Sequence, residues 1–87
     1  MTLSPTLITL DALPLGHSAT VVHLAPGTPE SGMDVSRRLM ELGFVPGERI
    51  RMLKRGVPGG EPLAVRVGES TFALRRFEAA LISVAPE

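Results

Sequence analysis

The stretch that decides the fold is Glu48 to Arg55, E-R-I-R-M-L-K-R. Ile50 and Met52 alternate in it with Arg49 and Arg51, a repeat of two residues. Successive side chains of a β-strand point to opposite faces, so this repeat is typical of a strand with one buried and one solvent-exposed face. The stretch therefore predicts a half-buried strand with arginines on its outer face.

Further strand signals lie on both sides of this stretch. They span residues 19–25, 62–67, 70–75 and 81–85. The connections at Pro58-Gly59-Gly60 and Gly68-Glu69-Ser70 are short and contain glycine. Such connections suit hairpins between antiparallel strands, because parallel strands need much longer crossovers.

One segment, at about 33–42, has the pattern of an α-helix. Val35, Leu39 and Leu42 recur at the spacing that lines one helical face. Gly43 follows where a left-handed C-cap belongs, and Val45-Pro46-Gly47-Glu48 fits a type II turn. The stretch from Pro26 to Gly32, rich in proline and glycine, is expected to be a surface loop.

These segments predict a mainly β fold, a small barrel of about five antiparallel strands with one inserted helix at about 33–42. A flat sheet of this size would leave two exposed edges, which a barrel removes. The 87 residues suffice for one domain. We expect residues 1–87 to form it, with a core at about 8–85 and a flexible N-terminus at 1–6.

Composition excludes several classes of protein. The chain has no cysteine, so neither disulfides nor a cysteine-based zinc site or nucleophile can form. Nine basic and nine acidic residues give a net charge of zero, and tyrosine and tryptophan are absent, which argues against nucleic-acid binding. No signal-peptide pattern or membrane-spanning apolar run is present, which predicts a soluble, cytoplasmic protein. Neither a nucleophile elbow nor a phosphate-binding glycine loop occurs, so no enzymatic activity is expected.

The segment L-M-E-L-G-F-V-P-G, Leu39 to Gly47, resembles the most recognisable stretch of the FeoA family of bacterial ferrous iron uptake. Four further blocks match in order: L-D-A-L-P-L-G-H at 10–17, G-E-P-L-A-V-R-V at 60–67, F-A-L-R-R-F-E-A at 72–79 and I-S-V at 82–84. The resemblance thus spans about residues 10–85. The loop at 26–32 departs from the family pattern.

The resemblance implies an SH3-like β-barrel and a non-enzymatic accessory role. The implied partner is the cytosolic, GTPase-bearing part of the ferrous iron permease FeoB, so any membrane association is indirect, through the permease. No cofactor is implied, and self-association stays open. The barrel also resembles the C-terminal domains of iron-dependent repressors, but no helix-turn-helix precedes it here.

Surface arginines are the candidate docking residues. Alternation places Arg49, Arg51 and Arg55 on one strand face, and barrel pairing would add Arg66 and Arg75 from the next two strands. Arginine is enriched at protein interfaces, because its planar fork makes paired hydrogen bonds and is weakly hydrated. Phe44 and Val45, just past the helix, are further candidates as apolar residues on a loop, although such residues also plug barrel ends.

The alternative function is direct metal binding or iron sensing. His17 and His23, with Asp11 nearby in the sequence, are the candidate ligands, since imidazole and carboxylate both suit Fe²⁺. Their separation of six residues matches no helical ligand spacing. Calorimetry with Fe²⁺ would distinguish this function from partner docking.

Overall fold

The computed structural model describes residues 6–25, 33–56 and 59–87, with side chains from residue 35 onward in the second range. The expected surface loop at 26–32 and most of the expected flexible N-terminus lie outside these residues.

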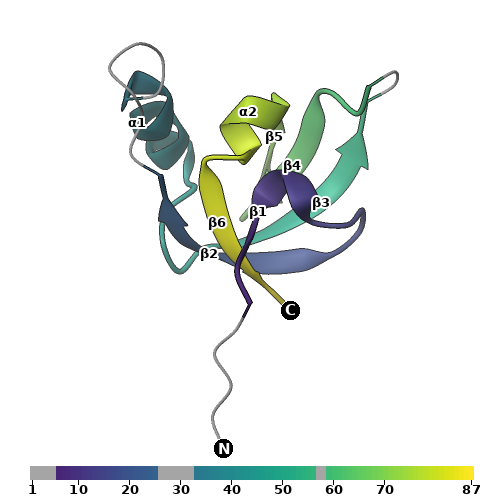
Figure 1. The fold of residues 1–87 in the computed structure, drawn as a ribbon, viewed down its shortest axis with the longest axis horizontal. Coiled ribbons are helices and arrows are strands. Elements are labelled where there is room, and N and C mark those ends of the chain that lie inside the picture. Colours follow the sequence, from purple (N-terminus) through teal and green to yellow (C-terminus); the bar gives the residue numbers. More distant parts are fainter. Residues whose placement is uncertain (1–5, 26–32, 57–58) are drawn as a thin grey trace, which may run out of the picture.

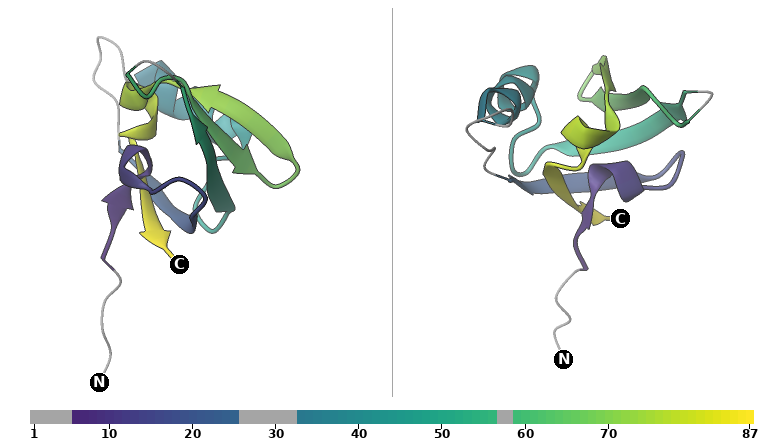
Figure 2. Two further views of the ribbon diagram at one scale, coloured as in Figure 1. Left: turned by 90° about the vertical axis from the view of Figure 1, so that its right-hand side faces the viewer. Right: turned by 45° about the horizontal axis from the view of Figure 1, so that its top comes forward.

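Six antiparallel strands form a single sheet that curls around the core (Figures 1 and 2). Along the chain, the elements are β1 (Ile8–Thr9), the 3-10 helix η1 (Leu10–Ala12), β2 (Ser18–Leu24), α1 (Met33–Leu42), β3 (Arg49–Arg55), β4 (Leu63–Val67), β5 (Ser70–Leu74), α2 (Arg76–Ala79) and β6 (Ile82–Pro86). The strand order in the sheet is β1-β6-β2-β3-β4-β5. The predicted mainly β, antiparallel architecture with an inserted helix at 33–42 is confirmed.

The structure adds three elements to the sequence prediction. The two-residue strand β1 pairs with β6, so the sheet has six strands and not five. η1 and α2 span three and four residues, too few for hydrophobic periodicity to show. The last strand begins and ends one residue later than expected, at Ile82 and Pro86.

The core lies inside the curled sheet and is almost entirely aliphatic. Its largest fully buried side chains are Phe44, Leu10, Leu13, Leu39, Ile50, Met52, Leu63, Leu74, Ile82, Val21, Val65 and Val84. The inward faces of β3 and β4 supply four of these, as the alternation predicted. Helix α1 contributes Leu39, and its half-buried Val35 and Leu42 pack against the same cluster.

The turn after α1 has the predicted geometry. Gly43 adopts a φ of 117°, and the Phe44 N–H donates to the Leu39 carbonyl at 3.0 Å. The Glu48 N–H then donates to the Val45 carbonyl at 3.0 Å, with Gly47 at a φ of 94°. Because a positive φ is strained for residues other than glycine, these two positions depend on glycine. The turn directs the chain from α1 into β3.

A buried carboxylate joins the two α-helices. Glu78 of α2 is 5% exposed, and its Oε1 accepts the Arg75 N–H at 2.8 Å. Its other oxygen lies 3.3 Å from Nη2 of Arg38 on α1. Buried carboxylates need such partners, because desolvation without them is costly. Glu78 therefore caps α2 and holds it against α1.

Candidate docking surface

Three of the predicted arginines come together on the outer face of the sheet. Arg51 of β3 stands directly opposite Arg66 of β4, and Arg49 precedes Arg51 on the same face. All three side chains are exposed, and they line a shallow hollow of about 290 Å³ with Ser18, Ile50 and Gly68. We call this group of six residues the basic hollow.

Two contacts position arginines of the basic hollow. Arg49 is ion-paired with Glu87, at 2.6 Å from Nε to Oε2 and 2.9 Å from Nη2 to Oε1. Arg66 donates from Nε to the Gly68 carbonyl at 3.1 Å, which leaves its terminal nitrogens available. Within the described part of the chain, neither Arg51 nor Arg66 is paired with a carboxylate.

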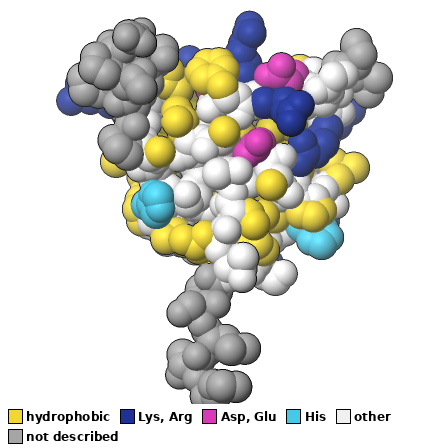
Figure 3. Space-filling model, viewed as in Figure 1, with side chains coloured by type: hydrophobic (Ala, Val, Ile, Leu, Met, Phe, Trp, Pro, Cys, Tyr) yellow, Lys and Arg dark blue, Asp and Glu magenta, His cyan; other side chains and the backbone are white. Residues whose placement is uncertain are grey.

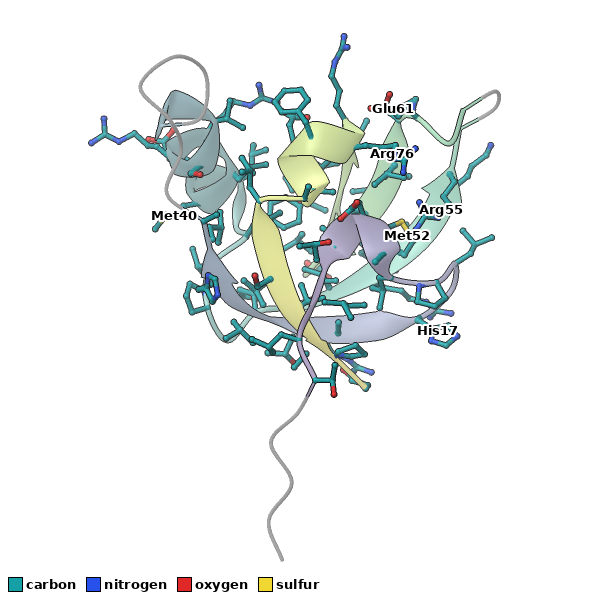
Figure 4. The ribbon with its side chains drawn as sticks, viewed as in Figure 1. His17, Met40, Met52, Arg55, Glu61 and Arg76 are labelled. Atoms are coloured by element: carbon teal, nitrogen blue, oxygen red, sulfur yellow. The ribbon has the colours of Figure 1, made fainter. Side chains whose placement is uncertain are left out.

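Arg55 does not belong to this surface, so the expectation that it shares a face with Arg49 and Arg51 is wrong. A bulge between Met52 and Lys54 shifts the register, and Arg55 pairs with the inward-facing Leu63. A bulge inserts one extra residue and so reverses the alternation beyond it. Arg55 instead closes one end of the barrel, beside η1 (Figure 4).

The guanidinium of Arg55 ties β3 to the segment around η1. Its Nη2 donates to the carbonyls of Asp11 at 2.7 Å and Leu13 at 2.8 Å. Arginine offers several donors in a fixed fork, so one side chain can satisfy two carbonyls. Arg55 therefore stabilises the packing of β3 against the segment around η1.

We expect Arg55→Ala to lower the free energy of unfolding by about 2 kcal/mol, because hydrogen bonds to a charged group contribute about 1.5–3 kcal/mol. The neighbouring exposed Lys54→Ala is the matched control and should cost under about 0.5 kcal/mol. Urea unfolding of both variants measures the difference. Equal costs would show that the two carbonyl contacts contribute nothing.

Arg75 lies at the other end of the β4–β5 hairpin. Thr71 of β5 is the register partner of Arg66, and Arg75 follows four residues later, roughly 13 Å along the strand direction. The expected grouping of Arg75 with the other arginines is therefore wrong. Together with Arg38, Arg75 lines a second hollow of about 560 Å³ between α1, β5 and α2.

The second hollow contains an apolar residue that the sequence did not single out. Phe77 of α2 is 55% exposed and lines this hollow with Val35 and Pro62. No periodicity could reveal it, because α2 is a single turn. Ser18 and Glu87 of the outer face also went unrecognised, since only the strand register brings them beside the arginines.

The two apolar residues after α1 differ in exposure: Phe44 is buried and Val45 is partly exposed. Phe44 is 0% exposed, and its ring lies 6.0 Å from that of Phe72, centroid to centroid. Val45 is half-buried at the start of the turn. The expectation that Phe44 is on an exposed loop is wrong, because its side chain fills the barrel interior.

The two histidines are exposed and lie on opposite sides of the molecule (Figure 3). His17 precedes β2 and His23 lies near its far end, so about 20 Å of extended chain separates them. Among residues 6–25, 33–56 and 59–87, no three His, Asp or Glu side chains are grouped to hold a metal ion. The geometry does not bring His17 and His23 into one site.

The fold and the surface together define a class of protein: a small antiparallel barrel with an arginine-lined outer face. No helix in the described residues is long and apolar enough to span a membrane. Residues 8–86 match the model of the FeoA domain, and the chain belongs to this family. FeoA proteins are non-catalytic accessory proteins, which confirms the expectation that this chain is not an enzyme.

Solved structures agree with this assignment. The chain is 44% identical to FeoA of Stenotrophomonas maltophilia in complex with zinc, with a TM-score of 0.79, covering 92% of this chain and 95% of that one. That protein is described as an SH3 domain protein and considered as a bacterial ferrous iron transport activating factor. The predicted SH3-like fold is thereby confirmed.

Two further solved structures share the fold. FeoA of Chlorobium tepidum is 35% identical, with a TM-score of 0.75 over 91% of this chain and 70% of that one. A manganese-dependent transcriptional repressor shares the fold at 21% identity and a TM-score of 0.80, over 99% of this chain and 45% of the repressor. No curated protein sequence matches the chain.

Proposed function

We propose that this FeoA protein is a docking module that binds the cytosolic, GTPase-bearing part of the ferrous iron permease FeoB and regulates or assembles it. The observation that carries the proposal is the pair of opposed arginines, Arg51 and Arg66, without carboxylate partners in the described chain. Like charges directly opposite each other on a sheet are destabilising. An acidic surface on a partner would relieve that repulsion.

The size of the barrel limits the area that the complex can bury. A standard interface buries about 800 Å² on each partner, roughly a seventh of the 5609 Å² surface of this chain. We expect the interface to include the basic hollow and the part of the outer sheet face around it. We expect a transient complex that weakens with salt, because exposed charges are screened over about 8 Å at 0.15 M salt.

The test is co-purification of the permease's cytosolic part with this chain in 0.15 M salt, with and without GTP and Fe²⁺. The proposal requires retention in at least one nucleotide state. Absence of retention in every state, and also with full-length permease in membranes, would overturn it.

The ion pair between Arg49 and Glu87 gives a second prediction. Glu87 is itself an acidic group bound to the proposed docking surface, and Glu87→Gln frees Arg49 for a partner. Exposed ion pairs contribute about 0.2–1 kcal/mol, so the affinity for the permease domain should rise by up to about fivefold. Calorimetry measures it, with the exposed Glu41→Gln as a control of equal charge change. If the affinity of the control rises by the same factor, the effect comes from the change in net charge and not from the release of Arg49.

A further inference from the structure

The register of the outer face aligns four side chains in a row across four strands. Ser18 of β2 pairs with Arg51 of β3, Arg51 with Arg66 of β4, and Arg66 with Thr71 of β5. Register partners in a sheet share one face. The row is thus a hydroxyl, two guanidinium groups and a second hydroxyl, and each of the four can donate hydrogen bonds.

The spacing within this row is short. The Met52 N–H donates to the His17 carbonyl at 3.0 Å, which makes Ser18 and Arg51 a non-hydrogen-bonded pair with Cα atoms about 4.5 Å apart. Arg66 is one strand further on, at about 5 Å. A single small ligand can therefore touch Ser18 and both arginines.

An independent observation points to the same place. The basic hollow of about 290 Å³ is lined by Ser18, Arg51 and Arg66 of this row. The Nε of Arg66 donates to the Gly68 carbonyl, and in the described part of the chain its terminal nitrogens make no hydrogen bond. Glu87 is paired with Arg49.

We propose that this row is a binding site for a phosphate group. A tetrahedral oxyanion has enough acceptor oxygens for two planar guanidinium forks and a hydroxyl at once, whereas a carboxylate has two oxygens in one plane. Phosphate also neutralises the two facing charges. All residues of the proposed site come from this chain, so phosphate binding does not require the permease.

The experiment titrates the isotope-labelled protein with inorganic phosphate at constant ionic strength and follows the backbone amide signals. Signals of Ser18, Arg51 and Arg66 should shift together in a saturable way. Glycerol 3-phosphate in a parallel arm tests whether the phosphate can be part of a larger molecule. Acetate is the control anion.

Variants separate a built site from a diffuse positive surface. Arg51→Gln or Arg66→Gln should each weaken phosphate binding at least about tenfold, because each removes charge-assisted hydrogen bonds. Ser18→Ala should weaken it by about two- to tenfold with the charge unchanged. Arg37→Gln on α1 is the matched charge control and should have no effect.

Saturable binding of either phosphate compound with these losses supports the proposal. It is overturned if neither compound shifts the signals, if acetate binds as tightly, or if Arg37→Gln weakens binding as much as Arg51→Gln. Co-purification of the permease is measured separately, so failure of phosphate binding would leave the docking proposal standing.

Discussion

Phe44→Ala should cost about 3–5 kcal/mol of unfolding free energy, the usual range for removing a buried aromatic ring. Phe44 is fully buried, and its ring contacts that of Phe72 on β5. A domain of this size has about 5 kcal/mol of net stability. We therefore expect the variant to be largely unfolded at 37 °C.

The same substitution at Phe77 is the matched control. Phe77 is 55% exposed, so Phe77→Ala should cost under about 1 kcal/mol. Urea unfolding monitored by circular dichroism compares the two variants. A small cost at Phe44 would contradict its place in the core and would restore the idea that it is a surface residue.

The second large effect is on docking. Arg51→Glu combined with Arg66→Glu should reduce the affinity for the permease's cytosolic part at least tenfold, because it reverses both charges that face each other in the basic hollow. Changing charged contacts at an interface lowers the affinity. Substitutions of exposed residues usually change the free energy of unfolding by no more than about 0.5 kcal/mol, so the variant should stay folded. Calorimetry in 0.15 M salt measures the affinity, and an unfolding curve verifies the fold.

A control of identical charge change tests whether position matters. Arg37→Glu combined with Arg76→Glu changes the net charge equally but alters α1 and α2, and both side chains are exposed. We expect its affinity to remain within about threefold of the wild type. If both double variants lose binding to the same extent, the docking surface is not the basic hollow.

Much of the fold could be predicted because the segments that build it repeat their pattern over several residues. The alternation along β3 and β4 correctly identified Ile50, Met52, Leu63 and Val65 as buried. The turn residues Gly43 and Gly47 marked where α1 ends and β3 begins. β1, η1 and α2 are too short to carry any period, so their existence depends on tertiary contacts.

The docking surface was harder to predict, because side chains alternate between the two faces of a strand only where its pairing with the neighbouring strand is regular. The bulge after Met52 turns Arg55 inward, and no residue type in that stretch signals it. The pairing of Arg51 with Arg66 depends on the hairpin register, which the sequence suggested only in outline. Phe44 looked exposed because it follows a helix, yet it packs on Phe72.

The most direct test of the account is to add the unlabelled cytosolic part of the permease to the isotope-labelled protein and map the amide signals that change. The account predicts changes centred on Ser18, Arg51 and Arg66, which fade as salt is raised because the contact is electrostatic. Changes confined to the hollow between α1, β5 and α2, around Phe77, would contradict it. So would an unchanged spectrum at saturating permease.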